Sequence, residues 1–142
     1  MKTSKEFLSS LLKSAQMGQI GIRSVLDTSM EPDLRNALCT QLAEYDAIEA
    51  EAHTIAAQRG WELTDVDPAL RFLTDRIARF RITGRDPGSK IADMMILGNT
   101  KSMIRELQNL HKFTHQDHRV RILCQKLLDC EAAGIQKMHG FL

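Results

Sequence analysis

Apolar residues recur at intervals of three and four along most of this chain. This spacing places them on one face of an α-helix. An alternation of apolar and polar residues, which would indicate β-strands, never persists for more than a few positions. Short links between the helical segments favour neighbours that run antiparallel. The pattern therefore predicts an all-α, antiparallel up-down four-helix bundle that forms a single domain over residues 1–142.

Residues that cap helices indicate where the elements begin and end. The first helix is expected to start at its N-cap Ser4 and to continue to about Thr28. The second opens at residues 29–32, where Pro32 suits the first helical turn, and it ends at Gly60. Asp117 is expected to cap the last helix, which continues to the C-terminus.

The third element of the bundle is expected to be interrupted near residues 82–88, where glycine and proline break the pattern. A segment that starts at Asp67 and Pro68 precedes the break, and a long helix follows it to about Lys112. Two interpretations stay open: one interrupted bundle helix, or a short helix followed by a long one. The expected buried stripe of the long helix is Ile91, Met94, Leu97, Ile104, Leu107 and Leu110.

Two glycines, Gly18 and Gly21, lie inside the first helix, although each costs about 1 kcal/mol relative to alanine there. We expect another backbone to come close at this turn, in a helix crossing or a small dimer contact.

Each helix has one polar residue on its expected core stripe. These residues are Gln19, Glu49, Asn99 and Glu131, and Tyr45 lies one turn before Glu49. An unpaired buried polar group costs about 1–3 kcal/mol, so polar residues on a core stripe indicate either a paired layer or a site.

The composition excludes several classes of protein. Apolar residues make up 43% of the chain and charged residues 26%, as in a globular domain. The 19 basic and 18 acidic residues leave a net charge of +1, so we expect no nucleic-acid partner. No apolar run is long enough to cross a membrane, and no signal peptide is evident, so we expect a cytoplasmic protein. The cysteines Cys39, Cys124 and Cys130 are expected to be small core residues.

One inward polar residue per helix, with Tyr45 and Glu49 on the second, resembles the ferritin-like superfamily of four-helix bundles. Residues 89–100 and 131–138 are similar to small uncharacterised ferritin-like proteins of Firmicutes. The superfamily resemblance implies a di-iron centre with a carboxylate from each of two helices and a Glu-x-x-His motif from each of the other two.

The chain departs from that ligand set. Glu49 and Glu131 would be the glutamates of the two motifs, but Ala52 and Gly134 stand where the histidines should be. Gln19 and Asn99 would replace the other two carboxylates, and neutral amides are poor ligands for iron. We therefore expect no cofactor and a degenerate metal site.

Two interpretations of the polar residues remain. Glu49 or Glu131 can bond to Gln19, Asn99 or the Tyr45 hydroxyl in a layer that sets the helix register, or can reach water at the edge of the stripe. Alternatively, the two glutamates form a residual site for iron, manganese, zinc or a small ligand. His53, four residues after Glu49, would then belong to the site.

Two further clusters carry weaker signals. His111, His115 and His118 are spaced for one helical face, but the expected helix break between them favours a solvated connector over a zinc site. Basic residues gather at Arg71, Arg76, Arg79, Arg81 and Arg85, where a phosphate or an acidic partner could bind.

The sequence thus favours a non-enzymatic bundle, expected to form a homo-oligomer, with an interaction or structural role. The alternative is a binder of metal or a small ligand that uses Glu49 and Glu131.

Overall fold

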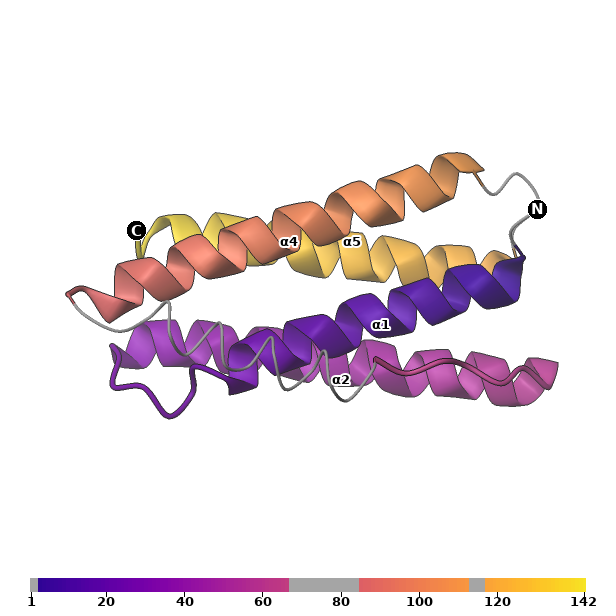
Figure 1. Ribbon diagram of the computed structural model, residues 1–142, viewed down its shortest axis with the longest axis horizontal. Helices are drawn as coiled ribbons and strands as arrows, with labels where there is room; N and C mark the ends of the chain where they lie inside the picture. Colours follow the sequence, from indigo (N-terminus) through magenta and orange to yellow (C-terminus); the bar gives the residue numbers. More distant parts are fainter. Residues whose placement is uncertain (1–2, 67–84, 113–116) are drawn as a thin grey trace.

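The computed structural model describes residues 3–66, 85–112 and 117–142, and in these residues it consists of four long α-helices without a β-strand (Figure 1). The helices are α1 (Ser4–Arg23), α2 (Pro32–Arg59), α4 (Pro87–Lys112) and α5 (His118–His139). The all-α prediction is confirmed for this part of the chain. The segment expected from Asp67 onward, and most of the break expected at 82–88, lie outside the described residues.

The helix ends follow local capping chemistry. Thr3, rather than Ser4, caps α1, because its hydroxyl accepts a hydrogen bond from the Glu6 amide at 3.2 Å. The helix ends at Arg23, short of the expected Thr28, and the chain continues in turns. Gly60 terminates α2 with φ of +70°, as expected for a left-handed C-terminal residue. The long helix α4 is described to Lys112, and the four residues after it lie outside the described residues.

The direction of the helices differs from a strict alternation. In Figure 1, α2 begins at the end of the molecule where α1 finishes, and α4 begins at that same end. The helices α2 and α4 therefore run in the same direction. The end of α2 at Arg59 and the start of α4 at Pro87 lie at opposite ends of the molecule. Most of the connection between these two helices lies outside the described residues, so the expectation of short links is not tested there. None of the described helices is both long and apolar enough to cross a membrane.

The core contains apolar side chains from all four helices. The largest fully buried side chains are Phe7, Leu8, Leu11, Leu12, Ile22, Leu34, Leu38, Tyr45, Ile55, Ile91, Leu123 and Leu127.

The expected stripe of α4 was wrong at three of its six residues, whereas Ile91 is buried and Met94 and Leu110 pack against the core. Leu97, Ile104 and Leu107 are 49%, 51% and 43% exposed. The helix instead buries Asn99 and Glu106, because its inward face passes through polar residues.

One glycine of α1 makes room for a side chain rather than for a second backbone. A Cβ built at Gly18 would lie 2.4 Å from ring atoms of Tyr45, so the tyrosine ring occupies the space that a methyl group would need. Gly21 has no heavy atom within 4 Å of such a Cβ. The close approach expected at these glycines therefore exists only at Gly18, and its partner is Tyr45.

Candidate functional site

Two glutamates lie completely buried between α4 and α5. Glu106 and Glu131 both have an exposed fraction of 0%. The Ser102 hydroxyl lies 2.8 Å from Glu106 Oε2 and 2.9 Å from Glu131 Oε1. The Ser14 hydroxyl donates to Glu106 Oε1 at 2.7 Å, so α1 contributes to the same cluster. We call these four residues the carboxyl cluster.

The hydrogen bonds of the carboxyl cluster require a proton on one glutamate. A serine hydroxyl has only one hydrogen, so Ser102 can donate to only one of the two carboxyl groups. The second contact is a hydrogen bond only if the other carboxyl group is protonated and donates to the Ser102 oxygen. Alternatively, the proton lies between the two carboxyl groups. Two ionised carboxylates that share one hydroxyl in a buried site would also repel each other strongly.

The electrostatics indicate which glutamate holds the proton. Burial, followed by the charge of Glu106, raises the pKa of Glu131 to about 9. Burial also raises the pKa of Glu106, but hydrogen bonds from Ser14 and Ser102 counteract that rise. Glu131 is therefore neutral at pH 7 and Glu106 is the better candidate for the ionised partner.

A second cluster joins α2 and α4 through two amides and a phenol. The Tyr45 hydroxyl donates to Asn99 Oδ1 at 2.8 Å, and Gln41 Nε2 lies 3.3 Å from both of these oxygens. Burial raises the pKa of Tyr45, so its hydroxyl stays protonated and acts as a donor. Two buried atoms, Gln41 Oε1 and Asn99 Nδ2, have no hydrogen-bond partner. We call these three residues the amide cluster.

The amide cluster fits because residue 134 of α5 is glycine. A Cβ at this position would lie 2.5 Å from Gln41 Nε2 and 3.0 Å from Asn99 Nδ2. Gly134, which stands where the second Glu-x-x-His motif would have its histidine, thus provides the space for these amides.

A third cluster lies between α1 and α2, nearer the surface. Gln19 Nε2 bonds to Asp46 at 2.8 Å and approaches Glu49 at 3.5 Å. Gln16, which the sequence did not single out, donates to Glu49 at 3.0 Å and to Asp65 at 2.9 Å. Glu49 is partly exposed and His53 is exposed.

The structure thus distributes the predicted site residues among three clusters. Gln19 approaches Glu49, as the layer hypothesis allowed, whereas Tyr45 and Asn99 bond to each other rather than to a glutamate. Glu131 bonds within the carboxyl cluster, whereas Glu49 accepts hydrogen bonds from Gln16 and Gln19. His53 is exposed and has no part in the carboxyl or amide cluster.

Sequence reasoning missed Glu106, the partner of Glu131. A signal was present, because Asn99, Ser102, Glu106 and Asn109 follow one another at helical spacing on one face of α4. The apolar Leu97, Ile104 and Leu107 provided a competing stripe, and we assigned that stripe to the core.

The buried cysteines behave as apolar side chains. Burial raises the pKa of the Cys124 thiol to about 12 and raises that of Cys130 as well, so both stay protonated. The expectation of a buried residue was wrong for Cys39, which is exposed on α2.

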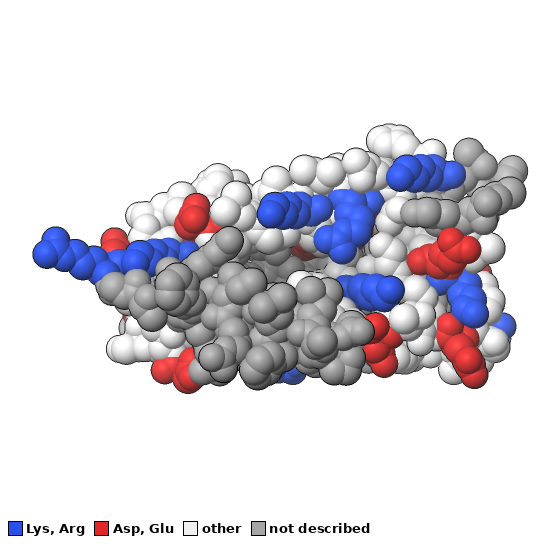
Figure 2. Space-filling model, viewed as in Figure 1, with Lys and Arg blue, Asp and Glu red and all other residues white. Residues whose placement is uncertain are grey.

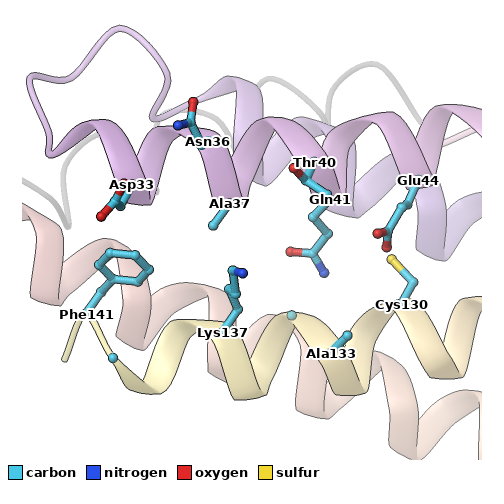
Figure 3. Close-up of a pocket in the computed structure, with 12 residues that line it drawn as sticks. Asp33, Asn36, Ala37, Thr40, Gln41, Glu44, Cys130, Ala133, Lys137 and Phe141 are labelled. Carbon is cyan, nitrogen blue, oxygen red and sulfur yellow. The ribbon is translucent and has the colours of Figure 1, made fainter.

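A cleft of about 550 Å³ lies between α2 and α5 beside the amide cluster (Figure 3). Gln41 points from α2 into this cleft, and Lys137 reaches into it from α5. Asp33 and Glu44 add carboxylates from α2, and Phe141 lies near one end. Its size suits a small ligand.

The donors of the carboxyl cluster do not fit a di-iron centre, which takes four carboxylates and two histidines. The cluster offers two carboxylates and two serine hydroxyls. Within residues 3–66, 85–112 and 117–142, no group of three or more histidine, cysteine, aspartate or glutamate side chains is placed to hold a metal ion.

The structure gives no support to a site at the histidine cluster or at the basic cluster in the residues that it describes. His111 and His118 are exposed, and His115 lies outside the described residues. Of the basic cluster only Arg85 is described, and it is exposed. Figure 2 shows lysine and arginine spread along the α4 side of this face, with acidic side chains between and below them. Neither charge covers the described part of the face by itself.

Comparison with protein-family models, with curated proteins and with solved structures gives no match to this chain.

Proposed function

We propose that this protein is a non-enzymatic ferritin-like helical bundle in which a proton stabilises the carboxyl cluster, and which acts through contacts with other polypeptide chains. The observation that carries the proposal is the pair Glu106 and Glu131, joined by the single hydroxyl of Ser102. A hydrogen ion on one of the two carboxyl groups removes the repulsion between them without an imidazole or a third carboxylate. The proposed degenerate metal site is thus held by hydrogen bonds and a proton, and it leaves one buried oxygen, Glu131 Oε2, without a hydrogen-bond partner.

The course of the chain supports the ferritin-like part of the proposal. Ferritin-like bundles have one long crossover connection between two helices that run in the same direction. The helices α2 and α4 run in the same direction, and 27 residues, 60–86, separate them. A simple up-down bundle with short links would reverse the direction at each step, so we propose the crossover topology in its place.

The net charge and the hydropathy of the described helices support a cytoplasmic protein without a nucleic-acid or membrane partner. With a net charge of +1, the chain has no excess of positive charge to attract nucleic acid. We propose a cytoplasmic protein that works without a membrane partner.

A metal analysis tests the proposal. The protein is purified without chelators, and its iron, manganese and zinc contents are measured beside those of the Glu106→Gln, Glu131→Gln double variant. We expect less than stoichiometric metal in both proteins, and a melting temperature that added iron(II), manganese or zinc leaves unchanged. About one metal ion per chain that disappears in the double variant would overturn the proposal. The variant Glu49→Gln, which changes the carboxylate of the separate cluster, controls for nonspecific effects.

One observation favours a second function, the binding of a small ligand. Gln41 is only 4% exposed, yet its Oε1 has no hydrogen-bond partner and the residue lines the cleft between α2 and α5. A ligand that donates an N–H or O–H group would satisfy this oxygen. Small amines and alcohols added in the same melting assay separate the two functions, because only the second predicts a rise in melting temperature.

A further inference from the structure

The outward face of α4 has a regular row of exposed residues. Three of them, Leu97, Ile104 and Leu107, are 49%, 51% and 43% exposed. Together with their polar neighbours they follow one another at intervals of four and three, the heptad spacing by which helices pair. We call the row the outer seam; its six residues, all exposed, are Asp93, Leu97, Thr100, Ile104, Leu107 and His111.

The two faces of α4 have an unusual distribution of polarity. Its inward face buries Asn99, Glu106 and Asn109, at 3%, 0% and 6% exposed. Its outward face presents branched apolar side chains to water. A surface helix normally has its polar residues outside, and apolar side chains gathered on an exposed face mark a contact with another chain.

The outer seam is complementary to itself when it is read in reverse. Around a centre at residue 102, Leu97 faces Leu107 and Thr100 faces Ile104. At both ends of the seam Asp93 faces His111, so a carboxylate meets an imidazole that can donate a hydrogen bond to it. In heptad terms each pair joins an a position to a d position, as antiparallel helices do.

We propose that the occupant of this surface is a second copy of the chain, with the two α4 helices packed antiparallel around a two-fold axis at residue 102. A two-fold contact requires one patch to complement itself, and the outer seam meets that condition along its whole length. Ile96 and Met103, which are partly buried against the core, extend the apolar contact on one flank.

The other flank of the seam contains a contact that weakens the dimer. In a two-fold antiparallel pair the same flank of both copies meets, so Lys101 lies beside Lys101 of the second copy. Two like charges on the rim repel each other, and salt screens that repulsion. We therefore expect a reversible dimer that a change at Lys101 strengthens.

Sedimentation equilibrium tests the surface and its register together. We expect the wild type to dimerise reversibly and Leu107→Glu to be monomeric, because the change places a carboxylate against Leu97 of the second copy. The control is Ile122→Glu, which changes a residue of α5 that is 44% exposed and should leave the dimer intact. Lys101→Gln should tighten the dimer several-fold. Circular dichroism shows that each variant is folded.

Three results would overturn the inference. A wild type that stays monomeric at millimolar concentration would exclude the second copy, and an acidic partner helix would become the better occupant of a seam bordered by Lys101 and Arg105. A dimer that survives Leu107→Glu would exclude this surface. Weaker dimerisation of Lys101→Gln would exclude this register. None of these results affects the proton in the carboxyl cluster, and metal binding there would leave the dimer unaffected.

Discussion

Glu131 connects the stability of the fold to the pH of the solution. In the folded chain its pKa is about 9, whereas an unperturbed glutamate has a value of 4.5. Between these two values the folded protein holds a proton that the unfolded chain releases. Stability must then fall as the pH rises through this window, because protons favour the state that binds more of them.

The variant Glu131→Gln should therefore reduce the pH dependence of unfolding. For the wild type we expect the free energy of unfolding to fall between pH 4.5 and about 9, by at most about 1.4 kcal/mol per pH unit for one proton. The glutamine variant cannot release this proton, so its slope should be shallower, with Glu106 as the remaining contributor. Urea unfolding measured at several pH values checks this. Equal slopes for the two proteins would show that Glu131 is ionised in the folded state.

At the residue scale, the sequence predicted a polar core but not its partners. Burial of Asn99, Tyr45 and Glu131 could be predicted because each continues an apolar stripe. The partnership of Glu106 and Glu131 could not, because it depends on how α4 is rotated about its axis. Glu49 shows the same limit, since a small rotation of α2 moves it from the interior to the edge.

At the element scale, the helix ends that one local residue determines were predicted from the sequence. Gly60 and Asp117 act on residues within a few positions of themselves, so the sequence contains the whole signal. The end of α1 has no such residue, and the chain leaves the helix at Arg23 although apolar spacing continues to Leu26. The apolar residues on the outward face of α4 were predicted to be in the core, because an apolar stripe alone does not reveal whether it faces the core or the surface.

The two glycines of α1 should respond to alanine in opposite ways. In Gly18→Ala the new methyl group would overlap the buried Tyr45 ring, so we expect a loss of about 1–3 kcal/mol of stability. In Gly21→Ala the methyl group meets no atom, and the higher helix propensity of alanine should add up to about 1 kcal/mol. Urea unfolding of the pair measures both. Equal effects would contradict the packing of Tyr45 on Gly18.

At the scale of the whole molecule, Asp117 joins three helices at one end. Its carboxylate accepts hydrogen bonds from the Arg119 and Val120 amides and so caps α5. The same carboxylate bonds to Arg59 of α2 at 2.8 Å, and its amide donates to the Ser4 hydroxyl of α1 at 3.0 Å. The ion pair with Arg59 lowers the pKa of Asp117.

Two substitutions separate the cap from the ion pair. Asp117→Ala removes both and should cost about 1–2 kcal/mol. Asp117→Asn keeps a good capping side chain and loses only the charge, so we expect it to be clearly less destabilising than Asp117→Ala. Thermal unfolding monitored by circular dichroism compares them. An asparagine variant as unstable as the alanine variant would mean that the link between α2 and α5, rather than the cap, carries the energy.

The directions of the helices could not be predicted from apolar spacing, because this spacing is the same whichever way a helix runs. The reversal between α1 and α2 follows from a link of eight residues, 24–31. The direction of α4 depends on how the chain returns between Gly60 and Asp86, and spacing within helices does not report on that path.

The packing of Tyr45 on Gly18 also restricts how this sequence can change over evolutionary time. Any side chain at residue 18 needs the space that the tyrosine ring fills, so a larger residue there becomes acceptable only once residue 45 has become smaller. The same dependence links Gly134 to Gln41 and Asn99. Among descendants of a common ancestor, these positions should therefore change together, and the pairs should vary far less freely than their neighbours.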